Sequence, residues 1–224
     1  MSDDARNAIL QRLEAAVPRP LPSRPALPPA PEKALDRDRL QALFIDRLTE
    51  QAGVVYPVAD PVALLETLAR ILAEEQVARA MVASDEVVAP LGLADRGRRH
   101  GVEMVTPADY PDRDRYVRAV FDDVQAGITG VDFAVAESGT LVLVHDARQA
   151  RLISLAPLVH IAVLPAERIV PDYETAMAAI YAGECRPGQI TFITGPSMTA
   201  DIQGTPFKGM HGPQKLIVLL LTQT

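Results

Sequence analysis

Apolar and polar positions follow two different periods along most of this chain. In several segments apolar residues recur every three or four positions, which predicts helices that each bury one face. These segments are residues 36–51, 61–77, 113–125 and 172–181. Between them lie short, nearly continuous apolar runs, at residues 53–59, 79–84, 101–107, 158–165, 189–195 and 215–222. Such runs are typical of strands buried on both faces, so the pattern predicts an α/β fold whose mostly parallel sheet is covered by helices on both faces.

One further pair of apolar runs predicts an antiparallel element. Residues 131–136 and 141–144 are joined by the short segment Glu137-Ser138-Gly139-Thr140. Two apolar strands with Ser-Gly between them are typical of a β-hairpin. We therefore expect an antiparallel hairpin beside the parallel strands.

The N-terminal part of the chain is organised differently. Residues 3–17 carry one helical apolar stripe, and residues 18–31 contain seven prolines in fourteen positions. Proline fixes φ and lacks a backbone donor, so the second segment is predicted to be extended. We predict an N-terminal helix over residues 1–17, a Pro-rich linker over 18–34 and one α/β domain over 35–224. The stripe then packs on its own chain or on a second copy in a homo-oligomer, and the alternative is another protein.

Charge excludes one class of partner. The 224 residues include 22 Lys and Arg against 29 Asp and Glu, a net charge of −7, whereas proteins that follow nucleic acid need concentrated positive charge. The basic cluster Arg96, Arg98, Arg99 and His100 is predicted to be a solvated patch on a loop. No nucleic-acid partner is therefore expected.

A single cysteine and the lack of a long apolar segment bear on cofactors and location. Cys185 alone allows no intrachain disulfide and no zinc or iron–sulfur site built from several thiolates. No spacing of His, Asp and Glu predicts a metal site. The acidic N-terminus is unlike a secretory signal, and the longest strongly apolar run, residues 216–221, is far shorter than the ~20 residues of a membrane span. We expect a cytoplasmic protein with no membrane span.

The turn of the predicted hairpin carries the first candidate for chemistry. Glu137 lies at a strand end, where open α/β sheets bind ligands, and a carboxylate can act there as base, nucleophile or hydrogen-bond acceptor. Gly139 permits a close approach of the backbone, and Thr140 adds a hydroxyl beside the carboxylate. The alternative is an ordinary acidic turn on the surface.

A second candidate follows the apolar run that ends at Thr194. Gly195 and Pro196 turn the chain, and beyond them we predict a short helix capped by a small polar residue. The candidate caps are Ser197, Thr199 and Asp201. Free N–H groups at a helix N-terminus beside small hydroxyls favour an anion, and the alternative is an ordinary capped turn. Neither a Walker loop nor a dinucleotide-binding glycine motif occurs in the sequence.

The segment between residues 194 and 213 is long for a connection between strands, and it contains four glycines and three prolines. His211 lies near its end, next to Gly212. After Asp201 the chain has no acid, while Lys208, His211 and Lys215 favour an anionic ligand such as a carboxylate or phosphate. Flanking glycines allow a ligand to approach the imidazole closely, and the alternative is a hydrogen-bonded structural histidine.

Glu137 and His211 are thus the candidate catalytic residues. The candidate ligand-binding residues are Gly139, Thr140, Thr194, Gly195, Ser197, Thr199, Lys208 and Gly212. We expect the hairpin turn and the two glycine-containing turns to meet around one cavity at one rim of the sheet. Two other polar residues are predicted to be structural: His160 as a satisfied core histidine, and Arg151 as a solvent-facing residue, with carboxylate binding as its alternative.

Four segments carry a family resemblance: GITGVDFAVAESGTLVL (127–143), LISLAPLVHIAVLPAERIVP (152–171), ITFITGPSMTADI (190–202) and GMHGPQKLIVLLL (209–221). In this order they resemble the LutC (YkgG-type) branch of the lactate-utilisation, or LUD-domain, family. The resemblance implies a NagB/RpiA/CoA-transferase-like α/β fold and a role in bacterial L-lactate oxidation to pyruvate beside two iron–sulfur proteins. Because this chain has one cysteine, any clusters are expected on the partner proteins, with no cofactor in the chain itself.

Three functions remain open from the sequence. The first is a subunit of a lactate-oxidising system that binds a small carboxylate or another anion. The second is a self-sufficient enzyme similar to a CoA-transferase, with Glu137 as nucleophile or base. Its turn Glu137-Ser138-Gly139 loosely resembles the Glu-Asn-Gly turn of those enzymes, with Ser in place of Asn. The third is a binding or regulatory module that docks partners through the N-terminal helix.

Overall fold

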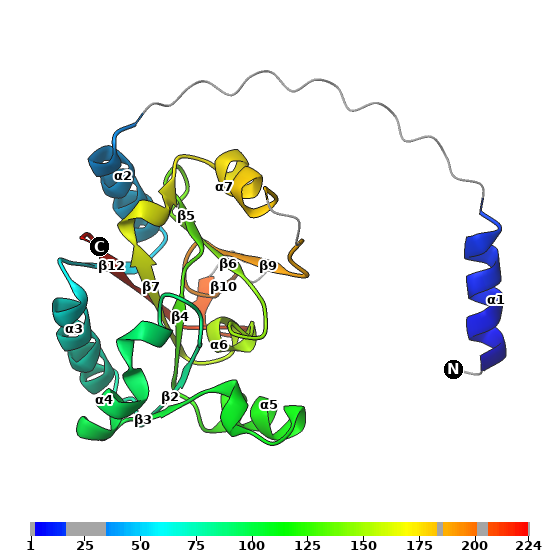
Figure 1. Cartoon of the computed structure of the whole chain (residues 1–224), viewed down its shortest axis with the longest axis horizontal. Coiled ribbons are helices and arrows are strands. Elements are labelled where there is room, and N and C mark those ends of the chain that lie inside the picture. The colour runs from blue at the N-terminus through cyan, green and yellow to red at the C-terminus, as the bar shows by residue number, and fades with distance from the viewer. Residues whose placement is uncertain (1–2, 17–34, 183–185, 201–205, 224) are drawn as a thin grey trace. The chain divides into compact units, whose positions relative to one another are not determined.

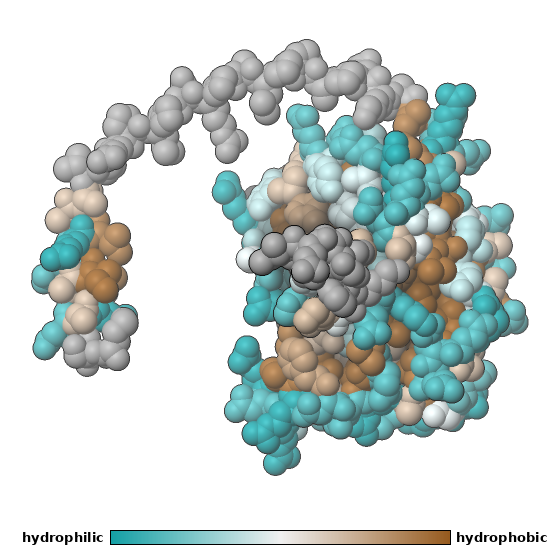
Figure 2. Space-filling view, turned by 180° about the vertical axis from the view of Figure 1, so that it is seen from behind, coloured by the Kyte–Doolittle hydropathy of each residue, from teal (hydrophilic) through white to brown (hydrophobic). Residues whose placement is uncertain are grey.

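The computed structural model describes residues 3–16, 35–182, 186–200 and 206–223, with the side chains of residues 200 and 206–208 excepted. The chain comprises two units, Met1–Lys33 and Ala34–Thr224. In the first unit, α1 (Asp3–Glu14) leaves Ile9, Leu10 and Leu13 exposed, and Figure 2 shows brown residues along one side of this helix. The linker predicted over residues 18–34 lies outside the described residues.

Helices of the second unit begin where the sequence offers capping residues. Asp60 accepts hydrogen bonds from the N–H groups of Val62 and Ala63 at 2.8 and 2.9 Å, as predicted for the cap of α3 (Pro61–Glu74). Asp172 caps α7 (Tyr173–Ile180) in the same way. The remaining α-helices of the described part of the unit are α2 (Arg37–Glu50), α4 (Leu93–Arg99), α5 (Arg113–Asp122) and α6 (Leu152–Leu155). Short 3-10 turns lie at Ala89–Leu91, Pro107–Asp109 and Ala166–Arg168.

The predicted parallel sheet is confirmed. Its six strands lie in the order β1-β12-β7-β4-β2-β3, and each neighbouring pair is parallel (Figure 1). They are β1 (Val54–Val58), β2 (Arg79–Val82), β3 (Glu103–Val105), β4 (Ala126–Gly130), β7 (Val159–Pro165) and β12 (Lys215–Leu221). The strands β7 and β12 form from the apolar runs at residues 158–165 and 215–222. Both are buried along nearly their whole length.

A second, mixed sheet holds the predicted hairpin. Its order is β8-β5-β6-β9, with β5 (Phe133–Val135), β6 (Thr140–Val144), β8 (Ile169–Val170) and β9 (Ile190–Ile193). The strands β5 and β6 are antiparallel, which confirms the hairpin. The strand β9 pairs antiparallel with the other edge of β6 and does not join the parallel sheet.

The two faces of the parallel sheet bury different layers. On one face, Ile161 and Leu219 pack in a cluster with residues of α3 and α4. On the other face, Leu164 and Val218 pack against α2 and the mixed sheet, while Met81 lies under α5 and α6. Figure 1 accordingly shows α3 and α4 on the opposite side of the parallel strands from α5 and α6. Helices therefore cover both faces, as the sequence predicted. No helix among the described residues is long and apolar enough to cross a membrane.

The strand β4 is missing from the sequence prediction, which starts the hairpin strand at Val131. Its sequence AGITG contains two glycines, which weaken any strand signal. A Cβ at Gly127 would lie 1.7 Å from the backbone oxygen of Ile153, so α6 rests directly on this strand. The glycine is therefore required by packing, and its cost is a weaker local preference for the strand.

A loop predicted around the basic cluster is wrong. Arg96, Arg98 and Arg99 belong to helix α4, although their side chains are exposed as expected. Gly97 lies on the inner side of this helix, where a Cβ would approach Met104 Cγ to 2.5 Å. The apolar contact with β3 therefore stabilises a helix that the short basic sequence does not predict.

The short helix predicted after Gly195 and Pro196 is also wrong. This segment forms β10 (Met198–Ala200), which pairs antiparallel with β11 (Pro206–Lys208). The N–H of Ser197 donates to the carbonyl of Pro213, and the N–H of Gly209 donates to the carbonyl of Ser197, both at 2.8 Å. Backbone groups expected to be free at a helix N-terminus thus hold a strand pair, and Asp201 lies outside the described residues.

Candidate functional site

A cavity of about 260 Å³ lies among α6, β9 and the turns that precede β10 and β12. We call it the histidine–hydroxyl cavity, because its polar lining consists of Ser154, His160, Thr191, Thr194, Ser197 and His211. None of the described residues that line it is acidic. Hydroxyl and imidazole donors without a competing carboxylate are suited to a small anion.

His160 forms part of the cavity wall from the buried strand β7. Its Nε2 lies 2.9 Å from the Thr129 hydroxyl on β4, and its Nδ1 has no hydrogen-bond partner among the described residues. Burial, with a smaller contribution from nearby His145, lowers the pKa of His160 to about 3. The ring is therefore neutral at physiological pH. The predicted core position is correct, but the predicted satisfaction of the ring is not.

His145 and Thr191 form a base–hydroxyl pair at the cavity. His145 follows β6, and its Nε2 lies 2.7 Å from the hydroxyl of Thr191 on β9. Its Nδ1 lies 3.0 Å from the carbonyl oxygen of Gln149, which can only accept, so Nδ1 carries the proton and Nε2 accepts from Thr191. Burial lowers the pKa of His145, which favours the neutral base. An oriented neutral imidazole beside a hydroxyl is the arrangement needed to take up a proton.

A cluster of hydroxyl groups joins the hairpin to the cavity. The Thr140 hydroxyl, which is fully buried, lies 2.8 Å from Ser138 Oγ, 2.8 Å from Tyr173 Oη and 2.9 Å from Thr194 Oγ1. Tyr173 is the first residue of α7, and its ring packs against Phe192 of β9 at 5.6 Å. Because Thr194 also lines the histidine–hydroxyl cavity, the start of β6 and the end of β9 meet at its edge.

The family of this chain follows from a match to its central and C-terminal parts. The model of the LUD domain family matches residues 42–221. The chain belongs to the LUD domain family. The α/β architecture and the order of segments described above are therefore those of a LUD domain.

Two similar proteins are named Lactate utilization protein C. One, from Anoxybacillus flavithermus, is 31% identical over 221 residues, which cover 96% of this chain and 98% of that protein. Another, from Deinococcus radiodurans, is 30% identical over 202 residues, which cover 89% of this chain and 88% of that protein. A crystal structure of a DUF162 family protein from Deinococcus radiodurans is similar with a TM-score of 0.60 and 25% identity, covering 84% of this chain and 99% of the other.

This LUD domain brings together part of the set of residues singled out from the sequence. The residues of that set that line the histidine–hydroxyl cavity are Thr194, Gly195, Ser197, His211 and Gly212. Thr140 joins them through its hydrogen bond to Thr194. The two glycine-containing turns thus share one cavity, as expected.

The turn of the hairpin itself does not line this cavity. Glu137 is half-buried, and its N–H donates to the carbonyl of Pro171 at 3.1 Å. Gly139 has φ +66°, and a Cβ there would lie 2.3 Å from the backbone nitrogen of Leu48. The close approach expected at Gly139 is therefore made to α2, and a role for Glu137 in the cavity is not part of this geometry.

Two further predicted residues lie on the short β10–β11 pair. Thr199 is half-buried on β10 and is paired with Phe207 of β11. Lys208 ends β11, and its side chain lies outside the described residues. A Cβ at Gly195 would lie 2.6 Å from the backbone oxygen of Gln51, so this glycine lets the turn pack on the end of α2.

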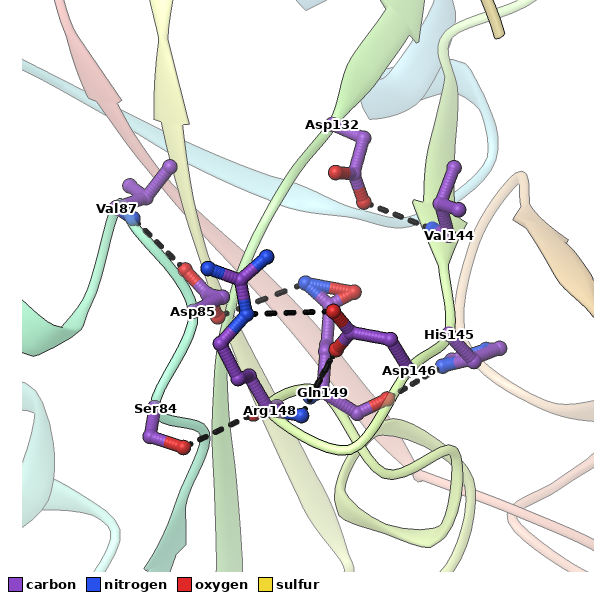
Figure 3. Close-up of polar contacts among 9 residues, drawn as sticks. All are labelled: Ser84, Asp85, Val87, Asp132, Val144, His145, Asp146, Arg148 and Gln149. Carbon is purple, nitrogen blue, oxygen red and sulfur yellow. Dashed lines mark hydrogen bonds and ion pairs between the residues drawn. The ribbon is translucent and has the colours of Figure 1, made fainter. Parts of the chain in front are cut away.

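Sequence reasoning missed a polar group at the carboxyl ends of β2 and β4. From β2 the chain goes on to β3 on one side of this pair, and from β4 it goes on, within this sheet, to β7 on the other side. Open α/β sheets bind ligands at such a reversal of strand order. Buried Asp85 accepts a 2.9 Å hydrogen bond from the N–H of Val87 and lies near Gln149 Nε2 (Figure 3). It also accepts a 2.9 Å hydrogen bond from the N–H of Gly130, whose carbonyl accepts from Gln149 Nε2. Backbone N–H groups thus satisfy the Asp85 carboxylate, which links the ends of the two strands.

A second carboxylate in Figure 3 braces the mixed sheet. Asp132 accepts a 2.7 Å hydrogen bond from the N–H of Val144, and burial raises the pKa of Asp132. No group of three or more His, Cys, Asp and Glu side chains among the described residues could hold a metal ion. The sequence did carry a signal for Asp85 and for His145: each lies directly after an apolar run, in the pairs Ser84-Asp85 and His145-Asp146.

Proposed function

We propose that this protein acts in bacterial lactate utilisation as a subunit that binds a small hydroxy- or keto-carboxylate in the histidine–hydroxyl cavity. The observation that carries the proposal is the 31% identity to a Lactate utilization protein C along 96% of this chain. Similarity along nearly the whole length of both chains supports a shared role better than any single motif in the sequence does.

The composition of the cavity supports a small monoanion as its ligand. Ligand pockets for larger molecules usually span about 300–1,000 Å³, and this cavity of about 260 Å³ lies just below that range. Ser197, Thr194 and His211 supply donors on its wall, and its described lining contains no carboxylate that would repel the ligand. A carboxylate can accept hydrogen bonds from these groups without requiring a fixed cation.

The pair of His145 and Thr191 supports a role in proton transfer. Oxidation of a 2-hydroxy acid to a 2-keto acid releases a pair of electrons and a pair of protons. In the proposed role, the Thr191 hydroxyl on the cavity wall takes up the hydroxyl proton of the substrate and passes its own proton to the neutral Nε2 of His145, which does not itself line the cavity. The hydrogen on the substrate carbon leaves with the two electrons to an acceptor on the partner proteins. Any iron–sulfur cluster in this route belongs to those proteins, because the single cysteine of this chain cannot ligate one.

The proposal is tested in a strain of the source bacterium that lacks this chain. We expect the strain to lose growth on L-lactate and to retain growth on pyruvate, and the wild-type chain to restore growth. A tagged chain from lactate-grown cells should co-purify with cysteine-rich partner proteins. Normal growth of the deletion strain on L-lactate would contradict the proposed function.

Ligand binding is tested separately with the purified chain. Isothermal titration with L-lactate and pyruvate should give binding that Ser197→Ala weakens. Arg115→Ala on helix α5, outside the lining of the cavity, is the control and should leave binding unchanged. Loss of growth without any binding to the wild-type chain would leave a role in lactate utilisation but remove the cavity from it.

A further inference from the structure

A second hollow of about 580 Å³ lies between α5 and the start of α6, away from the histidine–hydroxyl cavity. We call it the arginine groove. Its chemically active lining consists of Arg113, Asp114, Tyr116, Arg118, Phe121 and Arg151. The two hollows have no described lining residue in common. The groove is large enough for a cofactor-sized ligand, since such pockets usually span about 300–1,000 Å³.

The charge of the groove is opposite to that of the protein. Three arginines against one aspartate give 3 − 1 = +2, within a chain whose net charge is −7. Arg113 and Arg118 form no ion pair with described residues. Arg115 on the same helix, by contrast, pairs with Asp112, with Nε 3.8 Å from Oδ2. Arg113 and Arg118 therefore line the groove without an ion-pair partner among the described residues, although Asp114 belongs to the same lining.

Arg151 adds a third guanidinium to the groove. Its Nη1 donates to Gln189 Oε1 at 3.1 Å, and this neutral partner leaves the charge uncompensated. Tyr116 also lines the groove, but its hydroxyl is buried within the protein and is not exposed to the groove.

An aromatic ring completes the lining. Phe121 lies near the end of α5 and is 61% exposed, so its ring is available to a ligand. An exposed aromatic face beside guanidinium groups can stack on a planar ring while the arginines bind phosphate oxygens in a bidentate way.

We propose that the arginine groove binds a ligand that carries several negative charges and an aromatic ring, the chemical class of a nucleoside diphosphate. Arg113, Arg118 and Arg151 bind the phosphate groups, and Phe121 stacks on the base. This binding is independent of the proposed lactate role, since it uses none of the residues of the histidine–hydroxyl cavity.

The experiment is isothermal titration of the full chain with ADP, and with pyrophosphate, at low ionic strength. We expect saturable binding of ADP at one site per chain. Arg118→Ala and Arg113→Ala should each weaken it by about tenfold to a hundredfold, the effect of removing a charge-assisted hydrogen bond. The matched control is Arg115→Ala, which removes the same charge from the same helix outside the groove. Thermal unfolding of each variant checks that the fold is retained.

A second variant separates the two parts of the ligand. Phe121→Ala should weaken ADP binding by about tenfold and leave pyrophosphate binding unchanged, since an aromatic stack contributes about 1–3 kcal/mol. Three results would overturn the proposal: no binding of ADP at millimolar concentration, equal losses in Arg118→Ala and Arg115→Ala, or tighter binding of a poly-glutamate peptide than of ADP. If Phe121→Ala weakens the binding of neither ADP nor pyrophosphate, the assignment of the ligand as a nucleotide is overturned.

Discussion

The histidine–hydroxyl cavity and the arginine groove share α6 as a wall but differ in nearly every other respect. The cavity presents hydroxyls and imidazoles from strand ends and turns, whereas the groove presents guanidinium groups mainly from one helix. Neutral donors suit a small ligand with a single carboxylate, and fixed charges suit a ligand with several. The comparison teaches that one acidic protein can present two hollows of different donor chemistry within a few residues of each other, distinguished by where the donors come from.

A substitution under α6, the wall that the two hollows share, should disrupt both of them. At Gly127 even a Cβ would lie 1.7 Å from the Ile153 backbone oxygen, so Gly127→Val must push α6 away from β4. We expect the free energy of unfolding to fall by about 3 kcal/mol or more, measured by urea denaturation. Gly188→Ala is the control, because nothing lies within 4 Å of a Cβ there. Equal stabilities of the two variants would show that α6 does not rest on β4.

Acid should act on the cavity side of the molecule. His160 has a pKa of about 3 in the folded protein against an ordinary value of 6.5, so the unfolded chain binds its proton first as pH falls. Stability from the neutral ring is complete above pH 6.5 and is lost progressively between pH 6.5 and 3. The loss should reach several kcal/mol at the acid limit, since each pKa unit corresponds to about 1.4 kcal/mol.

Urea denaturation of the wild type and His160→Gln between pH 7 and pH 4 measures this difference. The variant should be less stable at neutral pH, because the buried ring is replaced, but should show a shallower loss of stability on acidification. Parallel curves for the two proteins would contradict a neutral buried His160.

The His145–Thr191 pair sharpens the comparison on the side of chemistry. His145→Gln should lower lactate turnover, in a system reconstituted with the partner proteins, by about 10²–10⁴-fold, the usual contribution of a general base. Thr191→Val should have a comparable effect, because His145 is not among the lining residues and is connected to the cavity through the Thr191 hydroxyl. Arg118→Ala in the arginine groove is the control and should retain turnover. A turnover unaffected by His145→Gln would exclude this base.

The smallest effect is expected at the hairpin turn. Glu137→Gln should change lactate turnover by less than about twofold, because Glu137 is not among the residues that line the histidine–hydroxyl cavity. The same assay with an acyl-CoA and a small carboxylate acceptor tests the CoA-transferase-like alternative. Acyl transfer by the wild type that disappears in Glu137→Gln would favour that alternative over the proposed function.

Local signals in the sequence sufficed for much of the fold. The caps Asp60 and Asp172 and the apolar runs of β7 and β12 depend on near neighbours, so their pattern predicted them correctly. The failures came from contacts distant in sequence. The glycines of β4 hide a strand because α6 needs the space, and the strand β10 replaces a helix because Ser197 bonds to Pro213 and Gly209.

The candidate site was predictable only in its turns. Glycine and proline mark the turns at Gly195 and Gly212, and these do share a cavity. The partnership of His145 with Thr191 joins residues 46 positions apart, and the Thr140–Thr194 bond joins residues 54 apart, so neither is visible in a local pattern. The arginines of α5 are spaced as an ordinary solvated helix face, and only the packing of α6 beside them makes a groove.

The hydroxyl of Thr140 has three oxygen neighbours within 2.9 Å but a single hydrogen to share among them. It can donate to one of them only, so the cluster has several arrangements of its hydrogens over the same heavy-atom positions. In some of these Thr194 directs its hydrogen to Thr140, and in others toward the cavity. The edge of the cavity can therefore switch between accepting and donating a hydrogen bond without moving an atom heavier than hydrogen.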